Sequence, residues 1–208
     1  MRFSITESYL TKRYFINCPF LCPRNMDANE KLQAFGLYIH GCSDGFSRKC
    51  IYLCCSSSKK VSTVLNYFLD SVWKYGFPNT ACSDKGRESM KVANYIFKNR
   101  GTGHYCFTTE KWIHNVRIER FWGEVNKYTL RYKKAFPKLQ DQWVLDVDNV
   151  LHLFSVAYIF IPRIERSLNQ FQNQWNRHKI CTAAYRTSNE LYLTIEKEKE
   201  GVNIASKP

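Results

Sequence analysis

The chain has 208 residues and a net charge of +13, from 31 lysines and arginines against 18 aspartates and glutamates. Its 14 phenylalanines, 13 tyrosines and 5 tryptophans exclude an intrinsically disordered polypeptide, and the length suits one domain with a buried core. The longest apolar stretch, residues 150–162, is too short to span a membrane. The excess of positive charge favours a polyanionic partner such as nucleic acid, because protein cations that neutralise phosphates release counterions.

The first half of the chain predicts an arm, a hairpin and a helix. Residues 1–20 mix basic and aromatic side chains and are predicted to form an arm that leads into the domain. Strand-forming runs at residues 37–40 and 50–55 flank Asp44-Gly45, a strong hairpin signal in which Gly45 is expected to take a positive φ. Apolar residues spaced by three and four predict an amphipathic helix over residues 61–73, which should end at Gly76.

The second half predicts two more strands among helices. Residues 80–82 form a short strand that carries Asp84 at its carboxyl end, and a helix follows from about Gly86 to residue 100. Another strand is expected at residues 105–108 and a long helix over residues 113–132, with Glu119 on its early turns. Residues 141–176 are expected to be mostly helical but broken near Pro162. Strands that alternate with helices indicate a mixed α/β fold, with a central sheet flanked by helices.

Three acidic residues, Asp27, Asp84 and Glu119, stand out as candidate catalytic residues and metal ligands. Phosphodiester chemistry with two metal ions needs carboxylates from distant chain segments, which hold the ions on either side of one phosphate. Taken singly, Asp84 is better explained as a turn residue and Glu119 as a solvated helix carboxylate. The functional interpretation is favoured only because both residues stand, in order, inside two blocks that resemble a known family.

Four blocks of sequence carry a family resemblance. Residues 40–48 read His-Gly-Cys-Ser-Asp-Gly-Phe-Ser-Arg, residues 83–89 read Ser-Asp-Lys-Gly-Arg-Glu-Ser, and residues 114–122 read His-Asn-Val-Arg-Ile-Glu-Arg-Phe-Trp. The fourth block starts at Leu151 and ends in Trp-Asn-Arg-His at residues 175–178. Together they resemble the catalytic core of retroviral integrases and DDE transposases, and most closely the integrase-core proteins of animal mobile elements.

This resemblance implies a ribonuclease H-like fold with a helical C-terminal extension, and an enzyme that cuts and joins DNA strands. It implies two Mg²⁺ or Mn²⁺ ions bound by Asp27, Asp84 and Glu119, since such hard cations prefer oxygen ligands. The candidate nucleic-acid-binding residues are Lys85, Arg87, His114, Asn115, Arg117 and Arg120. Further basic residues that are candidates for backbone contacts are Lys111, Lys127, Arg131, Lys133 and Lys134.

The first acid is either Asp27 or Asp44. Asp44 stands in the better motif, but an integrase-like core places its first acid on strand one, with two further strands before the first helix. Only Asp27 leaves two strands between itself and the helix at residue 61, so we favour Asp27 and interpret Asp44 as the residue that turns the hairpin. The segment around Asp27, however, lacks the Trp and both His residues of the family pattern, and its polar residues are not typical of a central strand.

Two other functions therefore stay open. One is a catalytically inactive, repurposed DNA-binding protein of transposon origin, and the other is a ribonuclease H-type nuclease that acts on RNA–DNA hybrids. The expected organisation is an arm at 1–20, a catalytic core at 21–136, a helical extension at 137–195 and a flexible tail at 196–208. The resemblance implies a homo-oligomer with DNA as partner, and the short apolar stretch predicts no membrane partner. The odd number of cysteines, 9, indicates reduced thiols and a nuclear or cytoplasmic rather than secreted protein.

Overall fold

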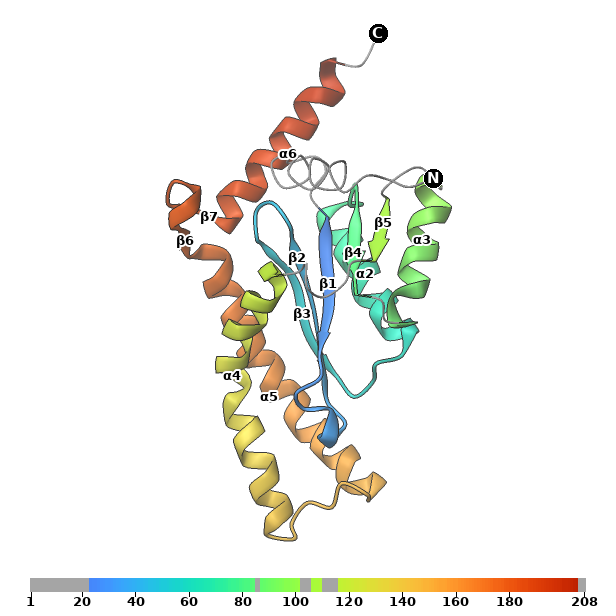
Figure 1. Cartoon of the computed structure of the whole chain (residues 1–208), viewed down its shortest axis with the longest axis vertical. Helices are drawn as coiled ribbons and strands as arrows, with labels where there is room; N and C mark the ends of the chain where they lie inside the picture. The colour runs from blue at the N-terminus through green and yellow to red at the C-terminus, as the bar shows by residue number, and fades with distance from the viewer. Residues whose placement is uncertain (1–22, 85–86, 102–105, 110–115, 206–208) are drawn as a thin grey trace, which may run out of the picture.

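The centre of the protein is a five-stranded mixed sheet (Figure 1). The computed structural model describes residues 23–84, 87–101, 106–109 and 116–205. The strands are β1 (Arg24–Asn29), β2 (Tyr38–Asp44), β3 (Cys50–Ser56), β4 (Ala81–Ser83) and β5 (Phe107–Thr109), in the order β3-β2-β1-β4-β5. β2 is antiparallel to both of its neighbours, whereas β1, β4 and β5 run parallel. The carboxyl ends of β1 and β4 therefore lie next to each other near the middle of the sheet.

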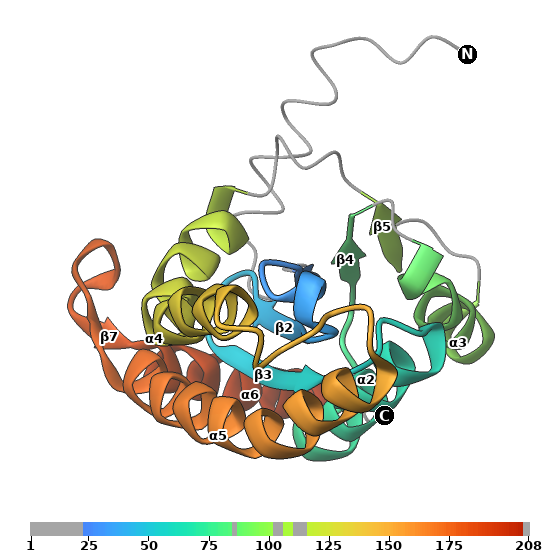
Figure 2. The same ribbon diagram turned by 90° about the horizontal axis from the view of Figure 1, so that it is seen from below.

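Helices cover both faces of this sheet (Figure 2). One cluster of buried side chains includes Val64 and Phe68 of α2 (Val61–Tyr75) and Ile96 of α3 (Met90–Arg100). The other includes Phe121 and Val125 of α4 (Val116–Asp141) with residues of α5 (Val150–Arg177). The remaining elements are short 3-10 turns at Gln33–Phe35, Arg87–Ser89 and Cys181–Ala183, a ribbon of β6 (Lys179–Ile180) and β7 (Arg186–Thr187), and the last helix, α6 (Ser188–Ala205). No helix among the described residues is long and apolar enough to cross a membrane.

The mixed α/β architecture confirms the fold class predicted from the sequence, a sheet of ribonuclease H-like order flanked by helices. Two expected elements differ in extent. α4 continues to Asp141, well beyond residue 132, and α6 continues to Ala205, past the position where the tail was expected to begin. The division of the chain into arm, core, extension and tail remains a prediction.

The expected break at Pro162 is wrong, because α5 is continuous from Val150 to Arg177. A proline removes one helical hydrogen bond, to the carbonyl group four residues earlier, here that of Tyr158. Both Pro162 and Tyr158 are exposed, so water can solvate that carbonyl group. The opposite side of the helix is held in the core by Ile164 and Leu168, which are fully buried. Core packing on one side thus outweighs the missing bond on the other.

The hairpin between β2 and β3 is confirmed, but the expected role of Gly45 is wrong. In this turn Arg48 has a positive φ of 59°, whereas Gly45 does not have a positive φ. Gly45 is instead required for a close approach: a Cβ atom there would lie 2.8 Å from the carbonyl oxygen of Pro23, which accepts a hydrogen bond from the Gly45 N–H. The turn itself is closed by Asp44, whose Oδ1 accepts hydrogen bonds from the backbone N–H of Phe46 and from the N–H and hydroxyl of Ser47.

Candidate active site

Asp27 and Asp84 come together at the carboxyl ends of two parallel strands. Met26 of β1 pairs with Ser83 of β4, so the residues that follow them, Asp27 and Asp84, lie side by side. This is the edge of an open sheet at which ligands of α/β proteins collect. Both carboxylates line one small pocket of about 20 Å³, together with Glu88 from the 3-10 turn after Asp84. A pocket of this size holds one water-sized group.

The carboxylate of Asp27 is largely buried and oriented by two donors. The backbone N–H of Ala28 donates to Oδ1 at 2.8 Å, and the indole Nε1–H of Trp122 donates to Oδ2 at 2.7 Å. Burial raises the pKa of Asp27 to about 6; the nearby carboxylates of Asp84 and Glu88 add to the rise, and the two hydrogen bonds oppose it. Three carboxylates, those of Asp27, Asp84 and Glu88, thus lie near one another at this site.

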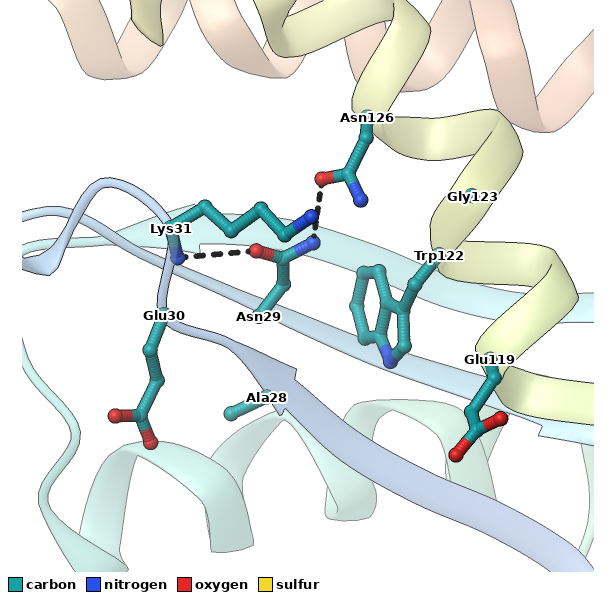
Figure 3. Close-up of a pocket in the computed structure, with 8 residues that line it drawn as sticks. All are labelled: Ala28, Asn29, Glu30, Lys31, Glu119, Trp122, Gly123 and Asn126. Carbon is teal, nitrogen blue, oxygen red and sulfur yellow. Dashed lines mark hydrogen bonds between the residues drawn. The ribbon is translucent and has the colours of Figure 1, made fainter. Parts of the chain in front are cut away.

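Glu119 lies on the first turn of α4 and is exposed to solvent. It lines a second, open pocket of about 460 Å³ between the end of β1 and α4, in which Trp122 is also found (Figure 3). Across the described ranges, no group of three His, Cys, Asp or Glu side chains is close enough to hold a metal ion. The structure therefore brings Asp27 and Asp84 together but does not place Glu119 in the same coordination set.

Asp44 does not reach the two carboxylates. It is paired with Arg24 at the start of β1, whereas Asp27 lies opposite Gly41, three residues further along the strand. Its Oδ1 is engaged by the hairpin turn, and the residue is 8% exposed. This geometry is consistent with Asp27 as the first acid, and the catalytic role of Asp27 stays a prediction.

The candidate nucleic-acid-binding residues are only partly described. Arg87 and Arg120 are exposed, on the 3-10 turn after Asp84 and on α4 directly after Glu119. Lys85, His114, Asn115 and the side chain of Arg117 lie outside the described residues, as does Lys111. Four lysines of α4 are also exposed: Lys127, Lys133, Lys134 and Lys138.

The sequence analysis missed one cation beside the acids. Lys59, from the loop before α2, forms ion pairs with Glu30 at the end of β1 and with Glu88, the latter at 3.2 Å. Burial alone would lower the pKa of Lys59, but its hydrogen bonds to Glu30 and Glu88 raise it, so the side chain stays charged. No spacing signal could have revealed this contact, because Lys59 joins two segments that lie far from it in the sequence.

His40, from the first motif block, supports the same loop. Its Nε2 lies 3.1 Å from the hydroxyl of Ser56 and 3.1 Å from the carbonyl oxygen of Ser58, and its ring contacts that of Tyr67. Burial lowers the pKa of His40, which favours the neutral ring. His40 thus holds in place the loop that carries Lys59.

A mixed sheet of this strand order, with carboxylates at the ends of β1 and β4 and on α4, defines a ribonuclease H-like fold of the integrase type. The chain belongs to the integrase core domain family, whose model matches residues 22–205. This confirms the family that the sequence motifs indicated.

Solved structures of retroviral integrases share the fold. The HTLV-2 integrase catalytic core domain in complex with magnesium, in its trimeric form, superposes with a TM-score of 0.52 at 14% identity over 83% of this chain and 98% of that one. Its dimeric form gives 0.51 at 14% identity over 83% and 99%. A chain of the simian T-cell lymphotropic virus intasome in complex with PP2A regulatory subunit B56 gamma gives 0.51 at 15% identity over 75% of this chain and 48% of that one. A search of curated proteins found no match.

Proposed function

We propose that this protein is a polynucleotidyl transferase that cleaves and joins DNA strands, with Asp27, Asp84 and Glu119 as its catalytic carboxylates. The observation that carries the proposal is the convergence of Asp27 and Asp84 at the ends of parallel strands, in a chain of the integrase core domain family. The net charge of +13 supports a nucleic-acid substrate.

The carboxylates fit a divalent metal ion. Asp27 and Asp84 offer oxygen ligands, which Mg²⁺ and Mn²⁺ prefer, and the raised pKa of Asp27 reflects burial and negative charge that a cation would relieve. The HTLV-2 relative was solved in complex with magnesium. Two such ions would supply the activation of a water or DNA 3′-hydroxyl and the stabilisation of the leaving oxygen. Glu119 is exposed, so its side chain can turn toward the pair and complete the ligand set.

The other side chains of the site have distinct tasks in this proposal. Ala28 and Trp122 fix the direction of the Asp27 carboxylate. Arg87 and Arg120 flank Asp84 and Glu119 in sequence and are exposed, so they would contact backbone phosphates of the bound strand. Lys59 keeps the carboxylate of Glu88 occupied, which leaves Asp27 and Asp84 as the metal ligands of their pocket.

A second candidate function is a DNA-binding protein that keeps the fold without the chemistry. The observation that favours it is that the three acids are not assembled into one ligand set among the described residues. The polar, atypical sequence around Asp27 points the same way.

We also propose that the protein acts as a homo-oligomer in the nucleus, where its DNA substrate lies. The HTLV-2 relatives were solved in trimeric and dimeric forms. The first half of α5 presents apolar side chains to solvent, including Leu151, Phe154 and Tyr158, and an exposed apolar face of this kind favours association. Sedimentation of the purified protein measures the state directly.

Strand nicking and disintegration of a branched DNA substrate test the function. We expect the wild type to cut the DNA with Mn²⁺, to lose activity with a chelator, and to lose it in Asp84→Asn and Glu119→Gln. An excess of RNA–DNA hybrid should compete weakly; preferential cleavage of the hybrid would favour the ribonuclease H-type nuclease. DNA binding without any cleavage, with both metals tried, would favour the non-catalytic protein.

A further inference from the structure

We propose that Trp122 is a positioning residue for Asp27. Two side-chain hydrogen bonds, Trp122–Asp27 and Asn126–Asn29, fix α4 against β1. We call this pair of bonds the β1–α4 ladder and each bond a rung. This inference rests on the proposed function, because it assigns to the ladder the task of setting the distance between two of the catalytic carboxylates.

The first rung is partly buried, and its indole is closely packed. The Trp122 indole is 8% exposed and donates to Asp27 Oδ2 at 2.7 Å. Its ring lies over Gly41, the residue of β2 that pairs with Asp27, and a Cβ atom at Gly41 would lie 2.7 Å from the ring. Any side chain at this position would therefore collide with the indole in the place from which it donates to Asp27. The packing of the ring on Gly41 therefore directs the indole N–H toward Asp27.

The second rung repeats the contact one step along both elements. Asn29 Nδ2 donates to Asn126 Oδ1 at 2.9 Å, while Asn29 Oδ1 accepts from the backbone N–H of Lys31 (Figure 3). Asn29 is 7% exposed, so this amide is satisfied within the protein.

The two rungs can form together because the spacing of Asp27 and Asn29 along β1 is close to the spacing of Trp122 and Asn126 along α4. Asp27 and Asn29 are two residues apart and share a face of β1, a separation of about 6.6 Å. Trp122 and Asn126 are four residues apart and share a face of α4, a rise of about 6 Å. A slip of α4 by one residue would break both bonds and leave buried polar groups without partners, which is costly. The ladder therefore selects one position of α4 on β1.

The position of α4 on β1 determines how far the backbone of Glu119 lies from the carboxylate of Asp27. Glu119 lies one turn before Trp122 on the same helix, so fixing Trp122 to Asp27 fixes the origin of the Glu119 side chain relative to that carboxylate. Asp27 retains lone pairs for a metal ion, because a carboxylate offers about four acceptor sites and the two hydrogen bonds occupy two. Groups that orient metal ligands in this way typically account for about tenfold or more in metal affinity.

The test is Mn²⁺ affinity measured by calorimetry on the full chain. Trp122→Phe keeps an aromatic ring but removes the N–H, and we expect Mn²⁺ binding to weaken about tenfold. Trp175→Phe is the matched control, because the Trp175 indole N–H also donates a hydrogen bond, to the carbonyl oxygen of Arg48 at 2.9 Å, away from the acids. It should lose similar thermal stability and keep the wild-type affinity. Asn126→Leu, which removes the acceptor of the second rung, should weaken binding in the same direction as Trp122→Phe.

A second replacement guards against misfolding of Trp122→Phe. Benzothienylalanine at position 122 keeps the bicyclic shape and has sulfur in place of N–H, so its folding should resemble that of the wild type. Weaker Mn²⁺ binding by this variant supports the ladder, and unchanged affinity overturns it. Absence of Mn²⁺ binding by the wild type would instead overturn the proposed function, and with it the role of Trp122.

Discussion

Asp27 is a carboxylate in an environment that disfavours its charge. Burial raises its pKa to about 6, although Trp122 and Ala28 donate hydrogen bonds that stabilise the ionised form. Perturbed ionisation of this kind is concentrated at functional sites. The protein thus tolerates a local loss of stability at neutral pH, which a bound cation would remove.

The stability of Asp27→Asn relative to the wild type should therefore rise with pH in the metal-free protein. A carboxyl group whose pKa is higher in the folded state contributes its stability below the unfolded pKa, near 4, and that contribution is lost as pH rises through about 6. Asparagine offers one acceptor oxygen to the two donors, so we expect the variant to be less stable than the wild type at pH 4. Between pH 4 and pH 7 the free energy of unfolding of the variant, relative to that of the wild type, should rise by about 2 kcal/mol.

Urea unfolding in a chelator at pH 4, 5, 6 and 7 measures this difference. Asp148→Asn is the control, since Asp148 is exposed and should show no such trend. A stability difference for Asp27→Asn that does not change between pH 4 and 7 would mean that Asp27 ionises as it does in the unfolded chain.

At the scale of elements, two helices end in the same unusual way. α2 is followed by Gly76, with φ 71° and ψ 169°, and α3 by Gly101, with φ 79° and ψ 177°. This region of φ and ψ is essentially restricted to glycine. Each glycine precedes a strand that runs parallel to β1, so the two sharp exits return the chain to the amino ends of β4 and β5, at the opposite end of β4 from Asp84.

Gly76→Ala should destabilise the protein by about 1–3 kcal/mol. A Cβ at Gly76 would contact nothing within 4 Å, so the whole cost is backbone strain. Gly123 is the matched control: its Cβ would also meet nothing within 4 Å, but it lies within α4, where alanine is favoured over glycine by about 1 kcal/mol. Thermal unfolding should thus show opposite shifts for the two variants, and equal shifts would contradict this explanation.

Much of the fold could be predicted at this scale, because the signals are local. Periodicity predicted α2 nearly to its ends, and Asp44-Gly45 predicted the hairpin. β1 was the least typical element, since several of its polar residues bond to partners far away in sequence. Arg24 donates to the carbonyl oxygen of Tyr75 at 2.9 Å and to the hydroxyl of Tyr192 at 3.4 Å. Such partners cannot be read from the segment itself.

The candidate acids of the site could also be predicted from the sequence, but their contacts with distant side chains could not. Motif blocks predicted Asp84 and Glu119 as candidate acids, and strand order favoured Asp27 over Asp44. The indole bond of Trp122 to Asp27 and the ion pairs of Lys59 escaped prediction, because both depend on how distant elements pack. The sequence thus indicated the candidate carboxylates, and the structure was needed to find the side chains that contact them.

At the scale of the whole molecule, positive charge is distributed along α4. Lys127, Lys133, Lys134 and Lys138 are exposed on this helix, which begins at the candidate site. A DNA backbone that passes the site would lie within reach of these side chains. Their contacts would provide affinity without sequence preference.

Lys133→Ala combined with Lys134→Ala should weaken DNA binding and reduce its dependence on salt. Each lost phosphate contact lowers the slope of log K against log salt by about 1. Lys91→Ala combined with Lys98→Ala removes the same charge from α3, on the far side of the sheet from α4, and should change the slope less (Figures 1 and 2). Fluorescence anisotropy between 50 and 200 mM salt, roughly the range over which such contacts are resolved, distinguishes the two pairs. Equal slopes would contradict a DNA path along α4.

The most direct test of the account is Mn²⁺-dependent nicking of branched DNA by Asp27→Asn and Asp44→Asn, measured side by side. Asp27 lies beside Asp84, whereas the Asp44 carboxylate closes a hairpin turn, in which asparagine can still accept through Oδ1. The account predicts that activity is lost in Asp27→Asn and kept in Asp44→Asn, with both proteins folded. Loss at Asp44 with full activity at Asp27 would contradict it and would place the first catalytic acid on β2.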